Sequence, residues 1–171
     1  MENAIENKVA QSGLIQLDLE TIRIPGERVF FDIKPLLFMD LVLKEKDFRA
    51  FLGDHAWNQY QGKHVAISCS SDAIIPIWAF MLVSIQMSPF ASTIVYGNLE
   101  DLEKELFAKS LLALNLDSYK DGRVVVKGCS KESVPTDAYV RLTTLLQPIV
   151  KSLFFGEPCS TVPIYKKKLT T

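Results

Sequence analysis

The sequence predicts an α/β fold, with a mainly parallel sheet, helices on both faces, and further strands at the N-terminal end. Two observations support this. From residue 64 onward, short apolar runs typical of buried strands alternate with longer segments of helical spacing. Before residue 64, two strand-like runs are separated by the turn-forming pair Pro25-Gly26. Strands that alternate with helices are typical of a parallel sheet covered by helices.

The N-terminal third has β character followed by a short helix. Residues 14–20 (LIQLDLE) alternate apolar and polar side chains as a half-buried strand does, and residues 28–34 (RVFFDIK) form a second strand-like run. Residues 44–52 (KEKDFRAFL) have helical spacing and end before Gly53, where a helix stop is expected. Residues 57–60 then act as a linker.

The middle third contains the first strand–helix units. Residues 64–69 (HVAISC) are typical of a buried strand, and the apolar run that follows predicts a buried helix that begins near Asp72, with Pro76 in its first turn. Residues 92–98 (STIVYGN) predict another strand. Residues 99–115 predict a helix with acidic residues near its start, as the helix dipole favours.

The C-terminal third repeats the pattern once more. Residues 123–129 (RVVVKGC) predict a strand, residues 135–155 a helix, and the remainder a tail containing prolines and lysines. We expect residues 1–171 to form a single domain, with flexible ends at residues 1–13 and 164–171.

The composition favours a cytoplasmic protein. With 171 residues, of which 48% are hydrophobic, the chain can bury one core. Nineteen basic residues oppose 20 acidic ones, and the net charge of -1 gives no general attraction to nucleic acids or acidic membranes. The sequence has neither an export signal nor a membrane-length apolar run. We therefore expect neither nucleic acid nor membrane as a partner.

Two nine-residue segments resemble each other. Residues 62–70 (GKHVAISCS) and 122–130 (GRVVVKGCS) share a glycine, a basic residue, a valine and Cys-Ser at the same offsets. Each is followed by a proline and then an Ala-aromatic pair. Both duplication and convergence explain this, because any two strand–helix units share such features. On either explanation, Cys69 and Cys129 lie at the carboxyl end of a strand, ahead of a helix, where open α/β sheets bind ligands.

Three cysteines form the candidate site. In the cytoplasm their thiols stay reduced, and a thiol at a helix N-terminus has a lowered pKa that favours the thiolate. If the two strands share a sheet, Cys69 and Cys129 can approach each other, and Cys159 lies in a loop that can fold back over them. Three thiolates with Asp72 as the fourth ligand would suit zinc or an iron–sulfur cluster. His64 is a weaker candidate because it begins the strand.

Other interpretations of the cysteines remain open. Each can be a small buried hydrophobe, since free cysteine is often buried. One of them, Cys69 or Cys129, can be a nucleophile of an enzyme or a sulfur carrier. Alternatively, the protein is a non-catalytic interaction module with a surface patch for a partner. The sequence contains no nucleophile elbow, Walker A or dinucleotide-binding motif, which favours a non-enzymatic protein.

Several long segments agree with one family. The segments KVAQSGLIQLDLE, GERVFFDIKPLLF, VAISCSSDAIIPIWAFML, VVVKGCSKESVPTDAYV and GEPCSTVPIYKKK resemble the bacterial family of unknown function numbered 2480, over essentially the whole chain. The resemblance implies no established activity. It implies a genomic association with sulfur mobilisation and iron–sulfur cluster assembly, and therefore iron–sulfur assembly proteins as partners. The family segments C-S-S-D, G-C-S and G-E-P-C-S-T match Cys69 with Asp72, Cys129, and Cys159.

Overall fold

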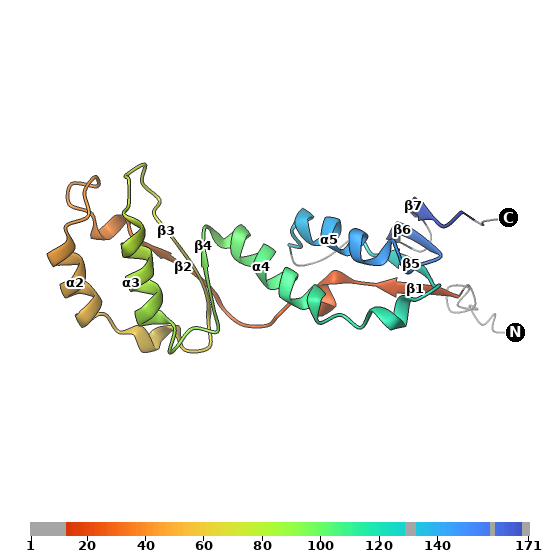
Figure 1. Ribbon diagram of the computed structural model, residues 1–171, viewed down its shortest axis with the longest axis horizontal. Helices are drawn as coiled ribbons and strands as arrows, with labels where there is room; N and C mark the ends of the chain where they lie inside the picture. Colours follow the sequence, from red (N-terminus) through yellow and green to blue (C-terminus); the bar gives the residue numbers. More distant parts are fainter. Residues whose placement is uncertain (1–12, 129–132, 158–159, 169–171) are drawn as a thin grey trace, which may run out of the picture. The chain divides into compact units, whose positions relative to one another are not determined.

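The computed structural model describes residues 13–128, 133–157 and 160–168. Within them the chain forms two compact units. Unit 2 comprises residues 24–106, and unit 1 comprises the described residues up to 23 and from 107 onward. The α/β class and the mainly parallel pairing are confirmed, but the strands are divided between two sheets, one in each unit (Figure 1). That residues 1–171 fold as a single domain stays a prediction.

Unit 2 contains a three-stranded parallel sheet in the order β2-β3-β4. Its elements are β2 (Arg28–Asp32), η2 (Lys34–Leu36), α2 (Glu45–Asp54), η3 (Trp57–Tyr60), β3 (His64–Ser68), α3 (Ile77–Met87), β4 (Thr93–Tyr96) and the first part of α4 (Leu99–Leu112). Val65 and Ile67 of β3 pack in one core with α2 and α3. Ala66, which alternates to the other face, packs with Leu102 and Leu106 of α4, so helices cover both faces of this sheet.

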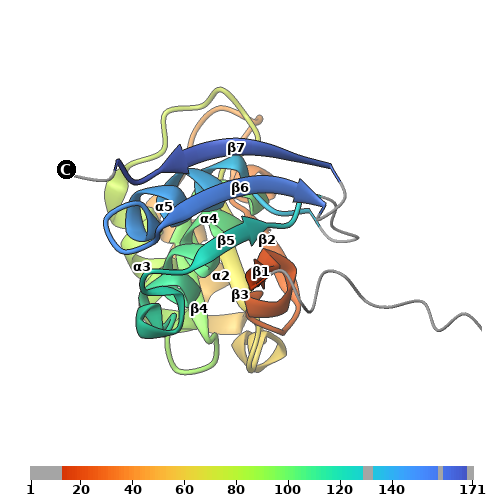
Figure 2. The ribbon, with the colours of Figure 1, turned by 90° about the vertical axis from the view of Figure 1, so that its right-hand side faces the viewer.

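Unit 1 contains a four-stranded sheet in the order β1-β5-β6-β7. Its elements are β1 (Leu14–Leu17), η1 (Leu19–Ile22), the last part of α4, η4 (Leu116–Tyr119), β5 (Arg123–Val126), α5 (Thr136–Leu146), β6 (Ser152–Glu157) and β7 (Ser160–Lys166). The first three strands are parallel, and β7 is antiparallel to β6 (Figure 2). Leu142 and Leu146 of α5 pack on Val124 and Val126 of β5.

The two units repeat one structural pattern at a fixed spacing of 59 residues. Helix α5 begins at Thr136 and α3 at Ile77, both have 11 residues, and both follow a proline in extended conformation. Two glycines with positive φ, Gly97 just after β4 and Gly156 near the end of β6, keep the same spacing. So do the backbone hydrogen bonds from Ser92 N to Lys63 O and from Lys151 N to Gly122 O. The sequence echo therefore extends to a repeated short helix–β–α–β arrangement, η3-β3-α3-β4 in unit 2 and η4-β5-α5-β6 in unit 1, although at 59 rather than 60 residues.

The one-residue difference matters for the cysteines. The structural spacing of 59 makes Cys69 the counterpart of Gly128 and not of Cys129. The sequence suggested that the two Cys-Ser pairs are equivalent. Their spacing of 60 residues differs by one from the structural spacing of 59, so they are not equivalent in the repeat.

Two helix boundaries differ from those that the sequence predicted. Helix α3 begins at Ile77 instead of near Asp72, and Pro76 is its N-cap in extended conformation. Proline disfavours helical conformation in the residue before it, so the chain cannot enter the helix earlier. Helix α2 continues through Gly53 to Asp54, because Gly53 stays helical instead of forming a left-handed cap.

The C-terminal region contains more β structure than expected. Helix α5 ends at Leu146, and residues 152–155, which the sequence placed in the same helix, belong to β6. Pro148, which lacks the N–H that a continuing helix needs, follows the helix end. The predicted tail contains β7, and residues 164–166, expected in a flexible end, pair with β6 as part of it.

Candidate functional site

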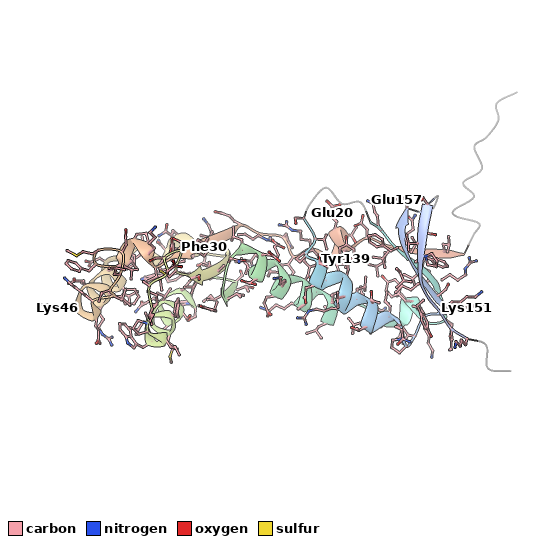
Figure 3. The ribbon with its side chains drawn as sticks, turned by 90° about the horizontal axis from the view of Figure 1, so that it is seen from above. Glu20, Phe30, Lys46, Tyr139, Lys151 and Glu157 are labelled. Atoms are coloured by element: carbon pink, nitrogen blue, oxygen red, sulfur yellow. The ribbon has the colours of Figure 1, made fainter. Side chains whose placement is uncertain are left out.

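The carboxyl end of the sheet in unit 1 gathers three charged side chains. Asp18 follows β1, Lys127 follows β5 and Glu157 ends β6, and parallel neighbouring strands end at the same edge of a sheet. Figure 3 shows Glu20 and Glu157 on the same side of unit 1, and Lys151, which precedes β6, on the other side. This carboxyl edge is where open α/β sheets bind ligands.

An ion pair occupies this edge. The Lys127 Nζ donates to Asp18 Oδ2 at 2.8 Å, and the backbone N–H of Glu20 donates to Asp18 Oδ1 at 3.0 Å. The hydrogen bond from Lys127 holds the pKa of the Asp18 carboxyl below its usual value, although partial burial opposes the shift. The same hydrogen bond and the charge of Asp18 raise the pKa of Lys127, with smaller contributions from Glu157 and Glu20.

A polar cavity of about 320 Å³ lies beside the ion pair. Its walls come from all three parallel strands and from η1, and are formed by Gln16, Asp18, Thr21, Val125, Lys127, Gly156 and Glu157. The cavity thus offers a cation, two carboxylates, an amide and a hydroxyl to a small ligand.

Glu157 brings an unusual group to this cavity. Its Oε1 is buried and has no hydrogen-bond partner among the residues that the structure describes. A buried carboxylate oxygen without a partner carries a desolvation cost that a ligand or cation would remove.

The chain that leads to two of the predicted cysteines starts from this edge. Cys129 and Cys159 themselves lie outside the described residues. Gly128, just before Cys129, is so close to β6 that a Cβ on it would lie 3.0 Å from Phe155 Cζ and 3.4 Å from Gly156 Cα. On the other side, Ser160 pairs with Glu157 across the β6–β7 connection.

Cys69 and Asp72 belong to unit 2. Cys69 follows β3, which is in a different sheet from β5, so the shared sheet edge that we expected for Cys69 and Cys129 does not exist. The side chain of Cys69 is partly buried against the core of unit 2, whereas Asp72 is exposed. Helix α3 begins only at Ile77, and Cys69 is therefore not at a helix N-terminus.

The remaining predicted ligand lies where the sequence placed it. His64 is at the amino end of β3, is 5% exposed, and its Nε2 lies 3.0 Å from Pro25 O. Among the residues that the structure describes, His, Cys, Asp and Glu side chains form no group of three that could hold a metal ion. In the same part of the chain, no helix is long and apolar enough to cross a membrane.

A second groove, which the sequence did not indicate, lies at the amino ends of the strands in unit 1. It has a volume of about 830 Å³, and its lining includes one acidic side chain, Asp121, and five basic ones: Arg123, Lys151, Lys166, Lys167 and Lys168. Only the Lys166–Lys168 run was visible as a cluster in the sequence. The pairing of β7 with β6, and of β6 with β5, adds Arg123 and Lys151 to it.

Comparison with known proteins identifies the family. The chain matches the model of a family described as protein of unknown function (DUF2480) over residues 3–167. It belongs to the DUF2480 family. No curated protein matches this DUF2480 chain, and neither does any solved structure. The resemblance seen in the sequence is thereby confirmed.

Proposed function

We propose that this protein is a cytoplasmic metal-binding accessory protein whose site lies at the carboxyl edge of the sheet in unit 1. The observation that carries the proposal is the buried Oε1 of Glu157, which has no partner among the described residues and lies beside the cavity next to the Asp18–Lys127 pair. A cation bound there would satisfy this oxygen.

The proposed ligands are the thiolates of Cys129 and Cys159 and the carboxylate of Glu157. The closeness of Gly128 to Gly156 supports this set, because Gly128 precedes Cys129 in the sequence, and the paired residues Glu157 and Ser160 stand on either side of residues 158–159. Two thiolates and one carboxylate fill three positions of a tetrahedral zinc site and leave the fourth for water or a partner's ligand. An iron–sulfur cluster is the alternative, and an accessory role in cluster assembly stays part of the proposal.

Cys69 and Asp72 are not part of this set. Cys69 packs against the core of unit 2, as a small buried hydrophobe does, and Asp72 is exposed. The positive charge of Lys127 is balanced by Asp18, to which it donates a hydrogen bond. Its repulsion of a cation bound at Glu157 is therefore reduced.

The test is elemental analysis and an absorption spectrum of the full chain, purified without oxygen or an affinity tag. We expect one zinc or iron site per chain, lost in Cys129→Ser, Cys159→Ser and Glu157→Gln and kept in Cys69→Ser. Loss in Cys69→Ser as well would restore the three-cysteine site that the sequence suggested. Metal-free wild-type protein would contradict the proposal, and a single fast-reacting thiol in it would then favour a nucleophile or sulfur carrier.

A second candidate function is a non-catalytic interaction module that binds an acidic protein segment. The observation that favours it is the groove with five basic side chains from three segments of unit 1, since such a groove attracts negative charge. An oligoglutamate peptide should bind with an affinity that falls as salt rises, and Arg123→Glu should abolish binding while Lys46→Glu, on α2 of unit 2, should not. Equal binding by both variants would contradict it.

A further inference from the structure

Helix α3 presents an apolar stripe outside the core of unit 2. Ile77, Met81 and Ile85, spaced four residues apart, are 78%, 60% and 64% exposed. The opposite stripe of the same helix, formed by Ala79, Val83 and Met87, is fully buried in the core. Helices that are apolar on both sides are typically buried on both sides.

The stripe continues onto the edge strand of the sheet. Tyr96 at the end of β4 is 71% exposed, and its ring lies edge-on to that of Phe80 at 5.1 Å between centroids. Together these residues line a depression of about 630 Å³ whose walls contain no charged side chain. Among the described residues, β4 pairs only with β3, so the backbone groups on its other side have no strand partner.

The repeat shows how the corresponding strand edge is paired in unit 1. The counterparts of Phe80, Met81 and Tyr96 at the 59-residue spacing are Tyr139, Val140 and Phe155. Tyr139 and Phe155 keep the edge-on arrangement at 5.7 Å, and they line an apolar groove of about 330 Å³. Here an additional strand is present: β7 pairs antiparallel with β6, and its Ile164 forms one wall of the groove.

We propose that in unit 2 a second copy of the chain takes the place that β7 takes in unit 1, so that the protein is a twofold-symmetric dimer. In this dimer β4 of each copy pairs antiparallel with β4 of the other, and the two α3 stripes pack together. The inference goes beyond the proposed metal site, which lies in unit 1, and does not depend on it.

Three features favour a second copy as the occupant. A twofold axis between two edge strands makes them antiparallel, which is the pairing that β7 makes with β6. The uncharged lining lets two identical surfaces face each other without like-charge repulsion. An antiparallel strand is also what the unpaired side of β4 needs, because an exposed edge strand otherwise recruits other chains at random.

A membrane surface is the less suitable occupant. Helices that lie in a membrane interface carry Lys or Arg on their polar face, and α3 has no charged residue over its whole length.

The test is the mass of the full chain in solution, measured by sedimentation equilibrium over a range of concentrations. Wild-type protein should be a dimer. Met81→Lys and Ile85→Lys should each raise the dimer dissociation constant by about a thousand-fold, because a central interface change acts twice in a symmetric dimer. The matched control is Val140→Lys, which makes the same change at the counterpart position in unit 1, where the strand β6 already pairs with β7; it should leave the dimer intact.

Circular dichroism checks that the variants fold, which we expect because the substituted side chains are exposed. A wild-type chain that stays monomeric at all concentrations overturns the inference, and so does a dimer that persists in both α3 variants. Binding of the wild-type chain to phosphatidylglycerol-containing vesicles that is lost in Met81→Lys overturns it in favour of a membrane surface. Because no metal ligand is changed in these variants, the outcome is independent of the elemental analysis.

Discussion

Ser70 donates both its backbone N–H and its hydroxyl to the carboxylate of Asp32, at 2.9 and 2.6 Å. Asp32 ends β2 and Ser70 follows β3, so these two bonds fasten the loop after β3 to the neighbouring strand. The backbone N–H of Lys34 adds a third bond to the same carboxylate. Ser70 thereby holds the loop that separates Cys69 from α3.

Removing this carboxylate should loosen the loop. We expect Asp32→Ala to lower the free energy of unfolding by about 1–2 kcal/mol, because hydrogen bonds to a charged group are among the stronger ones. Asp72→Ala is the control, since this side chain is exposed in the same loop and its loss should cost less than about 0.5 kcal/mol. Urea unfolding of the three proteins measures both, and equal stabilities would show that the Asp32 bonds are not formed in solution.

The same carboxylate should contribute to acid unfolding. Burial opposes the shift, but the hydrogen bonds from Ser70 and Lys34 together hold the pKa of Asp32 below 3.8. A carboxyl whose pKa is lower in the folded state stabilises the protein above the unfolded value, and this stabilisation is lost as pH falls through the folded pKa. Wild-type protein should therefore lose more stability than Asp32→Asn between about pH 4.5 and pH 2. The urea midpoints of wild type and Asp32→Asn, measured across this pH range, test the prediction. Midpoints that fall by the same amount in both proteins would contradict it.

Arg28 is the best-partnered cation of unit 2. It donates to Glu103 at 2.6 Å and to the carbonyl oxygens of Ile24 and Gly26, and both side chains of the ion pair are at most 15% exposed. Arg28→Ala should lower the free energy of unfolding by about 2–4 kcal/mol, because it removes the hydrogen bonds that Arg28 donates to a largely buried carboxylate and to two carbonyl oxygens. Arg49→Ala, which breaks an exposed pair with Glu45, should cost no more than about 0.5 kcal/mol. Thermal unfolding compares the two variants. Similar losses of stability in both would contradict the greater burial of the Arg28–Glu103 pair.

Replacing two glycines, Gly97 and Gly53, by alanine should change the free energy of unfolding in opposite directions. Gly97 has a φ of 133°, and a Cβ there would collide with the Asp101 carboxylate, so Gly97→Ala should cost about 1–3 kcal/mol. Gly53 lies within α2, where an alanine Cβ would have no other atom within 4 Å, and Gly53→Ala should stabilise the protein by about 0.5 kcal/mol. Chemical unfolding measures both changes. A loss of stability in Gly53→Ala would mean that the helix ends there, as the sequence suggested.

Much of the local structure was predictable. The strands at residues 64–68, 93–96 and 123–126 and the helix at residues 99–112 lie within the ranges that apolar runs and acidic helix starts indicated. The failures have a common cause. Residues 152–157 and 160–166 carry no pattern that distinguishes them from a helix end and a tail. They become strands through pairing, β6 with β5 and β7, and β7 with β6.

The candidate site was less predictable than the fold. The carboxyl edge of a sheet was the expected place, but the sequence combined Cys69 with Cys129, whereas the structure puts their strands in different sheets. Asp18, Lys127 and Glu157 were missed, because no motif marks them and 109 residues separate Asp18 from Lys127.

By itself, the sequence determined the α/β class, the order of most helices and strands, the family and the likeness of two nine-residue segments, since all of these depend on residue types along the chain. Only the tertiary structure decided that the strands form two sheets, that the repeat runs at 59 residues, and which charged side chains meet at the carboxyl edge of unit 1. The physical reason is that strand partners are chosen by long-range packing and hydrogen bonding, which leave no periodic trace in the sequence of either strand.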